Sequence, residues 1–355
     1  MLLPLFLGIK MAKTICFFNN KGGVGKTTTS TNVAAGLSTG LNKRVLYIDL
    51  DPQCNSTLLI LGGDVVSERY WDSPQNYKTI LDVIQPILDD DPSIFFEEDI
   101  VCKDVNRFGV HLIMGHPQLS ALEDRLGEAW VKISGGEIGA FRKTNWFSSL
   151  IDKVDSDYDY ILVDLGPSLG SLNRSTLIAA DYFVTPMSID IFSIIGLRNV
   201  RTWFDTWSNK YRGGALLLEE DRGGEVFERF NIKKNISITS GCLGYTTQTY
   251  ATRKNAYGER RPTKAYERLL TRFDEVFLEF LGGYLVDASK DGHHILGNIP
   301  NMFSLAPIAQ SSSSPIRDLK AEDGIFGAHY SQAKEFSSIF DNVAIEVVKR
   351  LEGQS

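Results

Sequence analysis

The sequence predicts an α/β protein in which a doubly wound, mainly parallel sheet is flanked by helices. Short apolar runs typical of buried strands alternate along the chain with longer amphipathic patterns typical of helices. A glycine-rich loop joins the first strand to the first helix, and aspartates follow two of the later strands. Because ligands of such sheets bind beyond the carboxyl ends of the strands, we expect the loop and these aspartates to lie at one edge.

The glycine-rich loop has the composition of a phosphate cradle and predicts a P-loop NTPase. An apolar run at 14–18 precedes it, and a helical pattern carrying Val33, Ala34 and Leu37 follows it. Backbone N–H groups and the positive end of the helix dipole are expected to hold the phosphates. The expected nucleotide-binding residues are Lys21, Gly22, Gly23, Val24, Gly25, Lys26, Thr27 and Thr28.

Two side chains of the loop have expected roles of their own. Lys26 is placed against the β- and γ-phosphates, and the Thr27 hydroxyl completes the shell of a Mg²⁺ ion. The first glycine of the standard pattern is replaced by Asn20, and a second lysine, Lys21, follows it. A loop lysine can also simply be solvated. Its place between the strand and two glycines favours a contact with nucleotide.

The segment Lys-Gly-Gly-Val-Gly-Lys-Thr-Thr resembles the deviant Walker A loop of the ParA/MinD family of nucleotide-switch ATPases. The resemblance implies ATP and Mg²⁺ as ligands and a homodimer formed with ATP. It also implies that Lys21 is catalytic together with Lys26, because in that family the early lysine reaches the nucleotide bound by the partner subunit.

Aspartates follow the strands predicted at 44–48 and 159–163. The first strand ends in Asp49-Leu50-Asp51-Pro52-Gln53, which resembles the second nucleotide motif of the family. By that resemblance Asp49 contributes to the Mg²⁺ shell through water and Asp51 orients the attacking water. Asp164 ends an apolar strand, as a Walker B carboxylate on the Mg²⁺ shell does. The alternative for the paired aspartates is turn formation and helix capping.

The remaining elements continue the alternation of strands and helices. Helices are expected at 77–88, 118–130, 140–154, 171–180, 191–211 and 331–351, and strands at 110–113 and 181–186. The acidic stretch at 89–99 reads as a solvated surface. A segment at 296–301 resembles the part of the family that borders the adenine, which makes Pro300 and Asn301 expected base contacts. The closing helix at 331–351 is expected to pack on the sheet, since a membrane-targeting helix needs a more basic polar face.

A basic segment at 253–281 is the candidate for a nucleic-acid contact. Its predicted DNA-binding residues are Arg253, Lys254, Arg260, Arg261, Lys264 and Arg268. Such a cluster neutralises phosphates without reading bases, and ParA-type proteins similarly bind bulk DNA without sequence preference. The alternatives are a solvated basic face and pairing with the acidic stretch at 89–99.

Length and composition limit the classes of protein that fit. The chain has 355 residues, 43% of them hydrophobic, and a net charge of −7, so any DNA contact must be a local patch. We expect residues 1–10 to be an extension without an assigned role and 11–355 to be a single P-loop ATPase domain. No stretch is apolar enough to cross a membrane, and the four cysteines are scattered. A cytoplasmic protein, including one associated with the nucleoid, is expected.

These observations predict a ParA-like ATPase switch. ATP is expected to favour a sandwich dimer, and Mg²⁺-dependent hydrolysis to release it, with a separate partner protein stimulating hydrolysis. The dimer would partition or position DNA, whether plasmid or chromosome, or another cargo. Two alternatives remain: a MinD-like switch at a membrane surface, and a metabolic ATP-dependent enzyme such as a ligase or an iron–sulfur reductase. The scattered cysteines count against the reductase.

Overall fold

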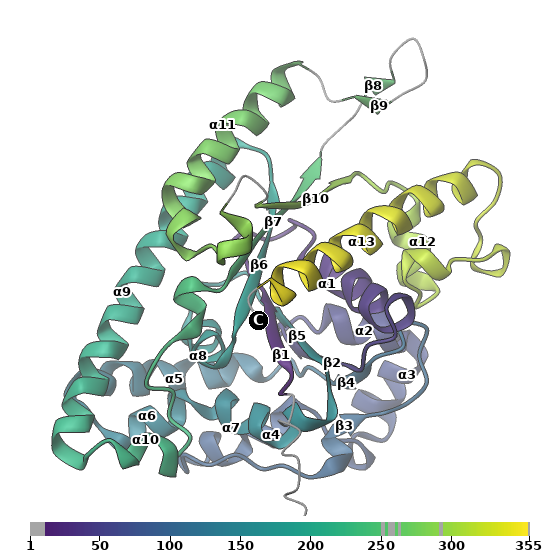
Figure 1. The fold of residues 1–355 in the computed structure, drawn as a ribbon. Helices are drawn as coiled ribbons and strands as arrows, with labels where there is room; N and C mark the ends of the chain where they lie inside the picture. Colours follow the sequence, from purple (N-terminus) through teal and green to yellow (C-terminus); the bar gives the residue numbers. More distant parts are fainter. Residues whose placement is uncertain (1–10, 250–252, 255–259, 262–263, 291–293, 354–355) are drawn as a thin grey trace, which may run out of the picture.

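The computed structural model describes residues 11–249, 253–254, 260–261, 264–290 and 294–353. For 249, 253–254, 260–261 and 264–271 it describes the backbone alone. An eight-stranded sheet runs through the molecule in the order β10-β7-β6-β1-β5-β2-β4-β3 (Figure 1). Its paired strands are parallel except for the edge strand β3, which runs antiparallel to β4. The predicted doubly wound, mainly parallel sheet is therefore confirmed.

The strands and helices follow one another as the sequence pattern predicts. The strands of the sheet are β1 Lys13–Phe17, β2 Val45–Leu50, β3 Val101–Cys102, β4 His111–Ile113, β5 Tyr160–Leu165, β6 Tyr182–Ser188, β7 Cys242–Thr249 and β10 Ile295–Pro300, and the pair β8 Arg253–Lys254 and β9 Arg260–Arg261 lies apart from it. The helices are α1 Lys26–Ala35, α2 Asn55–Leu61, α3 Gly63–Ser67, α4 Ile80–Leu88, α5 Leu119–Lys132, α6 Ile138–Thr144, α7 Trp146–Val154, α8 Ser171–Ala179, α9 Ile191–Arg222, α10 Glu225–Arg229, α11 Lys264–Leu281, α12 Leu305–Ser311 and α13 Ala328–Glu352.

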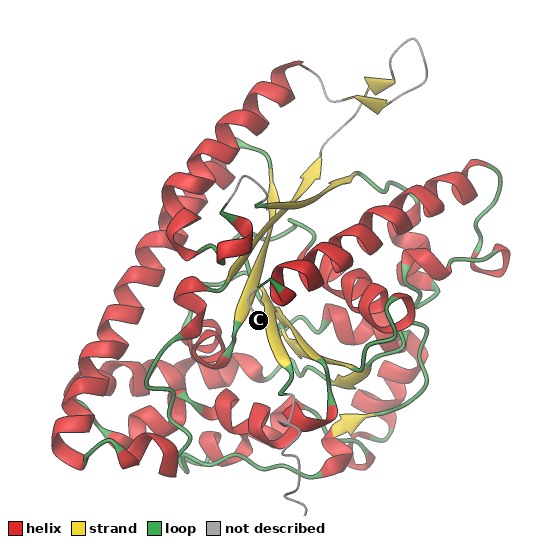
Figure 2. Cartoon of the chain, viewed as in Figure 1, coloured by secondary structure: helices red, strands yellow, loops and turns green. Residues whose placement is uncertain are grey.

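Helices cover both faces of the sheet, as Figure 2 shows. Alternate side chains of β1 enter two different cores, because successive residues of a strand point to opposite faces. Phe17 packs with α1 and α13 on one face, whereas Cys16 packs with the helices α5, α8 and α9 on the other. Such two-sided burial is what makes the central strands nearly continuous apolar runs.

Two predicted helices have different limits in the structure. The helix predicted at 140–154 is wrong as one element, because Asn145 separates α6 from α7. The Asn145 side chain donates to the Phe141 carbonyl at 2.8 Å and accepts from the Lys233 backbone N–H at 3.0 Å. One local bond and one long-range bond thus hold a residue that favours turns over helix interiors. The helix predicted at 191–211 continues to Arg222.

The closing helix packs as predicted. In α13 the side chains of Phe336, Phe340, Val343, Val347 and Leu351 are buried. Arg350, in the last turn, is also buried and donates to the carbonyl oxygens of Leu243, in β7, and of Ile295, in β10. Within the part of the chain that is described, no helix is both long and apolar enough to span a bilayer.

The acidic stretch at 89–99 pairs with lysines from neighbouring elements. Lys78 contacts Glu97 and Asp99, and Lys143 contacts Asp90. These carboxylates are more than half exposed, so the pairs contribute little to the free energy of unfolding. The prediction of a solvated acidic surface agrees with this exposure.

Candidate nucleotide-binding site

The glycine-rich loop connects the buried end of β1 to the first turn of α1. Gly23 and Gly25 have φ angles of 72° and 77°, in the left-handed region that favours glycine. The side chain of Asn19 holds the start of the loop, since it donates to the Pro186 carbonyl at 2.7 Å and accepts from the Lys21 N–H at 2.9 Å. No side chain caps α1 at Gly25. The N–H groups of its first turn are therefore available for a ligand.

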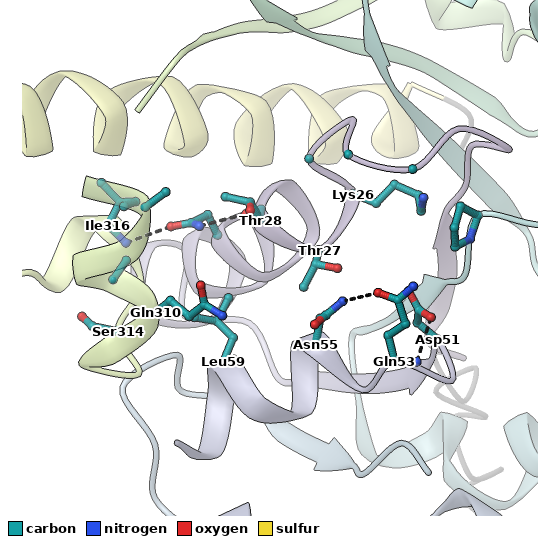
Figure 3. A pocket seen from close by; sticks show the side chains of 17 residues that line it. Lys26, Thr27, Thr28, Asp51, Gln53, Asn55, Leu59, Gln310, Ser314 and Ile316 are labelled. Atoms are coloured by element: carbon teal, nitrogen blue, oxygen red, sulfur yellow. Dashed lines mark hydrogen bonds between the residues drawn. The ribbon is translucent and has the colours of Figure 1, made fainter. Parts of the chain in front are cut away.

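A cavity of about 430 Å³ opens in front of this loop (Figure 3). The loop and α1 form one wall, the segment after β2 forms a second, and the segment after β10 forms a third. The lining residues are Gly22, Gly23, Gly25, Lys26, Thr27, Thr28, Asn32, Asp51, Gln53, Asn55, Leu59, Pro167, Ala306, Ala309, Gln310, Ser314 and Ile316. The side formed by the loop is glycine-rich, and the remaining wall mixes apolar side chains (Leu59, Ala306, Ala309 and Ile316) with polar ones (Asn32, Gln310 and Ser314), which leaves room for a base beyond the phosphates.

Asp49 and Asp164 are adjacent at the carboxyl ends of β2 and β5, where they are register partners. Both are fully buried. Asp49 accepts hydrogen bonds from the Thr57 N–H at 2.8 Å, the Thr57 hydroxyl at 2.6 Å and the Asp51 N–H at 3.2 Å. Burial raises the pKa of Asp49, and these hydrogen bonds oppose the rise.

The two carboxyl oxygens of Asp164 have different surroundings. Its Oδ2 accepts from the Thr27 hydroxyl at 2.7 Å, while Oδ1 is buried and has no hydrogen-bond partner among the described residues. Burial, together with the neighbouring Asp49 and Asp51 carboxylates, raises the pKa of Asp164 to about 8. A buried carboxylate oxygen without a partner beside a threonine hydroxyl suits a hard divalent cation, because such cations prefer oxygen ligands.

Asp51 lies where the cavity approaches the loop after β5. Its side chain is buried, and its Oδ1 accepts from the Gln53 N–H at 3.0 Å. A Cβ at Gly166 would lie 3.4 Å from the same oxygen, so the two segments are in close contact. Asn173 holds the loop by donating to the carbonyls of Gly166 at 2.9 Å and Ser168 at 2.8 Å.

The two lysines of the loop have different surroundings. Lys26 is buried in the wall of the cavity, and its Nζ donates to the Lys21 carbonyl at 3.2 Å. Burial lowers the pKa of Lys26, and the Asp164 and Asp51 carboxylates partly oppose this effect.

Lys21 does not line the cavity. Its Nζ contacts Asp190 Oδ2 at 2.5 Å and the Ser193 hydroxyl at 3.3 Å. Asp190 is also the N-cap of α9 and accepts from the Ser193 N–H at 3.0 Å. Burial raises the pKa of Asp190, but the bonds from Lys21 and Ser193 outweigh it, and the pKa is lowered overall.

The structure brings most of the predicted phosphate-site residues to one place. The predicted residues that line the cavity together are Gly22, Gly23, Gly25, Lys26, Thr27, Thr28 and Asp51. Asp164 contacts this group by accepting a hydrogen bond from the Thr27 hydroxyl. Val24 belongs to the loop, but its side chain is buried. Pro300 and Asn301, at the end of β10, do not line the cavity, and Asn301 accepts from the Phe303 N–H at 2.8 Å. Their contact with a base stays a prediction.

Sequence reasoning missed the wall formed by the segment after β10. Asn32 of α1 joins this wall to the phosphate loop, because it donates to the Thr28 carbonyl at 2.8 Å and accepts from the Ile316 N–H at 2.9 Å (Figure 3). Ala306, Ala309 and Gln310 of α12 complete the wall. No local pattern distinguishes these residues, since chain folding alone brings them to the cavity.

The predicted DNA-binding residues lie in β8, β9 and α11. Arg253 and Lys254 pair with Arg261 and Arg260 in an antiparallel ladder, and Lys264 and Arg268 belong to the first half of α11. The side chains of all six residues lie outside what is described. Their contact with DNA stays a prediction.

A family model matches the part of the chain that contains the phosphate loop, and relatives of known sequence match about half of the chain. A family model described as an AAA domain matches residues 12–213, more than half of the chain. The sporulation initiation inhibitor protein Soj of Bacillus subtilis is 34% identical over 189 residues, which cover 53% of this chain and 62% of Soj. A Pseudomonas putida protein of undefined role is also 34% identical, over 54% of this chain and 61% of its own length. The match thus spans less than two thirds of these relatives.

Solved structures extend the likeness over nearly the whole chain. A protein from Corynebacterium diphtheriae is 30% identical and superimposes with a TM-score of 0.72, covering 97% of this chain and 100% of its own. The ParA of pNOB8, solved bound to nonspecific DNA, superimposes with a TM-score of 0.55 at 22% identity, covering 97% of this chain and 100% of its own. At that identity the second likeness concerns the fold alone.

Proposed function

The chain belongs to the ParA/Soj family, whose model is described as an AAA domain, and from this premise we propose that it binds and hydrolyses ATP with Mg²⁺ as the metal ion. The observation that carries the proposal is the cavity in which the phosphate loop, Lys26 and Asp51 meet. Three of its features support a nucleoside triphosphate: an uncapped helix N-terminus, a buried lysine, and a threonine hydroxyl beside a carboxylate with a free oxygen.

Each residue has a role that follows from its place. The loop N–H groups and Lys26 hold the phosphates and offset the charge that develops on the transferred group. Thr27 and Asp164 would hold Mg²⁺, which supplies further charge neutralisation when bound, and Asp49 would contribute through water. Asp51, fixed by Gln53 and close to Gly166, orients a water molecule for attack.

Replacing Asp51 with asparagine tests the hydrolytic role. The variant keeps the size of the side chain but loses its charge. We expect its turnover of ATP to fall by about 100-fold, at the low end of the effect of a positioned acid or base. Binding of a fluorescent ATP analogue should stay within about threefold of the parent, because Asp51 is not among the groups that hold the phosphates. An undiminished rate of phosphate release would show that another residue positions the water.

We further propose that ATP converts the protein into a dimer that binds duplex DNA without sequence preference. In this dimer Lys21 would leave Asp190 and contact the partner's nucleotide. The basic segment at 253–281 supplies the positive charge for DNA, and the pNOB8 ParA, which shares the fold, was solved on nonspecific DNA. The dimer would partition or position DNA or another cargo, and a separate protein would stimulate hydrolysis. A cytoplasmic location, with association to the nucleoid, follows from such a role.

Replacing Arg260, Arg261 and Lys264 together with alanine tests the DNA contact. If each neutralises one phosphate, the slope of log affinity against log salt should become shallower by up to about three units. Fluorescence anisotropy with arbitrary duplexes at several salt concentrations measures this slope. The matched control replaces Lys210, Arg212 and Arg222 of α9, which changes the net charge equally. Equal loss of binding in both variants would assign the effect to net charge and not to this segment.

The structure gives less support to the first of the two alternative functions and leaves the second to experiment. A switch at a membrane surface needs an exposed apolar face, whereas α13 buries Phe340, Val343 and Val347 against the sheet. A lack of cosedimentation with anionic vesicles is expected. A metabolic ATP-dependent enzyme needs a pocket for a second substrate beside the phosphate site, and ATP turnover that requires no second substrate would separate it from the switch.

A further inference from the structure

The segment after β10 packs on a hydrophobic core of its own. We call residues 301–325 the wall segment, because they contribute one wall of the nucleotide cavity. In Figure 1 its helix α12 lies beside α13. Its apolar side chains meet those of β10 and α13 in a cluster separate from the two cores on the faces of the sheet. The buried members of this cluster are Ile299, Met302, Leu305, Ala309, Ile316, Leu319, Ile325, Ala333, Phe336 and Phe340. The distance of this wall from the phosphate loop therefore depends on how the wall segment is attached to its surroundings.

Polar contacts attach the wall segment to α1. The Ile316 N–H donates to the Asn32 side chain at 2.9 Å, and the Arg317 guanidinium donates to the Ala35 carbonyl at 3.3 Å. Arg317 also pairs with Asp341 of α13 at 3.2 Å. These contacts hold the side of the wall segment that faces the first helix.

A single arginine attaches the wall segment to the loop before β4. The Nη1 and Nη2 groups of Arg107 donate to the two carboxyl oxygens of Asp323, at 2.7 Å and 2.9 Å. Its Nε donates to Asp318 Oδ2 at 3.0 Å, and Nη2 also contacts the Asp318 carbonyl. Paired bonds of this kind between a guanidinium and a carboxylate fix geometry as well as adding energy. The Asp323 side chain is only 6% exposed, and the bond from Arg107 lowers its pKa, so this carboxylate stays charged.

The loop that carries Arg107 is itself fixed. The next residue, Phe108, is fully buried in the core that also contains residues of α1 and β2. The Asn106 side chain donates to the carbonyls of Asp104 at 3.0 Å and Val110 at 2.7 Å. Arg107 thus projects from a rigid base, and its contacts determine where the far side of the wall segment lies.

We propose that Arg107 is a positioning residue that holds the wall segment at the separation from α1 that the base of ATP requires. The inference rests on the proposed function, since it concerns the ATP site proposed there. Arg107 does not line the cavity, so it acts through Asp318 and Asp323. The phosphate loop and Lys26 belong to a different wall. Loss of Arg107 should therefore weaken the part of the affinity that the base supplies and leave the phosphate contacts in place.

Replacing Arg107 with alanine tests the inference when ligands with and without a base are compared. Isothermal titration calorimetry measures the affinities for ATP and for inorganic tripolyphosphate, each with Mg²⁺. In Arg107→Ala the affinity for ATP should fall by about tenfold, because binding must then also order the wall segment. The affinity for tripolyphosphate should stay within about twofold of the parent, since the phosphates bind away from the altered contact.

A second variant covers the case in which Arg107→Ala does not fold, because alanine leaves the buried Asp323 carboxylate without its cation. Arg107→Lys keeps the charge but not the two parallel bonds. Its affinity for ATP should fall by about threefold, again without a change for tripolyphosphate. Melting temperatures show which variants are folded at the temperature of the titration.

Two further variants serve as controls. Arg44→Ala removes an arginine that pairs with Asp159 at 3.5 Å, at the amino end of β2 and so at the opposite edge of the sheet from the cavity. It should bind both ligands as the parent does. The double variant Arg107→Ala/Asp323→Ala should bind ATP no more weakly than Arg107→Ala, because both changes remove the same attachment.

The comparison of the two ligands separates the inference from its premise. Equal losses for ATP and tripolyphosphate would show that Arg107 supports the fold or the phosphate loop and not the wall. Unchanged affinity for ATP in the Arg107 variants would show that the wall needs no such attachment. A parent protein that binds neither ligand would contradict the proposed function itself.

Discussion

Lys26→Ala is expected to weaken ATP binding by about 10- to 100-fold, which corresponds to the roughly 1.5–3 kcal/mol of a hydrogen bond to a charged group. Lys26 is buried in the wall of the cavity, where its Nζ donates to the Lys21 carbonyl and feels the charges of the Asp164 and Asp51 carboxylates. Phosphate oxygens are better partners for this cation, since they bring the charge that the site is built to neutralise. Titration with a fluorescent ATP analogue measures the change.

The control for Lys26→Ala is Lys103→Ala, at an exposed lysine that follows the edge strand β3. It should bind the analogue as the parent does. Both variants should unfold in one transition at temperatures close to that of the parent, because Lys26 makes no long-range ion pair in the described structure. Undiminished binding in Lys26→Ala would mean that the cavity does not hold phosphates.

Lys21→Ala is expected to bind ATP within about threefold of the parent and yet to stay monomeric in its presence. Lys21 does not line the cavity of its own chain, so its loss leaves the phosphate contacts intact. If it completes the partner's site, each monomer of the variant lacks a cation that the other needs. The mass measured by light scattering with a non-hydrolysable analogue distinguishes monomer from dimer.

Asp190→Asn is the matched control for Lys21→Ala, because it removes the same ion pair from the other side. Asparagine remains a good N-cap for α9, and the pair is about one-third exposed on both sides, so its loss costs about 1 kcal/mol or less. This variant keeps Lys21 and should dimerise at least as readily as the parent. Dimers of Lys21→Ala equal to those of the parent would overturn the switch mechanism.

The parts of the fold predicted from sequence are those with a local signal. The apolar runs of β2, β5 and β6 are buried on both faces. A strand buried in this way is a nearly continuous apolar run, so it can be predicted from its own residues without knowing which strands pair with it. The phosphate loop is likewise encoded in consecutive residues. Asp49 and Asp164 were placed together because strand ends in a parallel sheet share one edge, and they are register partners.

The parts that sequence could not predict depend on contacts between distant segments. The break at Asn145 arises from its bond to Lys233, and the Asp190 partner of Lys21 comes from the far end of β6. Gln310 lines the cavity in a wall that the bond from the Ile316 N–H to Asn32 ties to α1. None of these pairs has a spacing that a helix or strand pattern would reveal.

The central place of β1 in the sheet has a consequence for folding kinetics. Lys13 pairs with Tyr160, and Ile15 pairs with Tyr182, so the strand that carries the phosphate loop waits for neighbours made much later in synthesis. Pairing strands that are so far apart in sequence is slow, because the chain loses the entropy of the long loop before the stabilising contacts form. The nascent chain must therefore keep this apolar strand from aggregating until about half of its residues have been made.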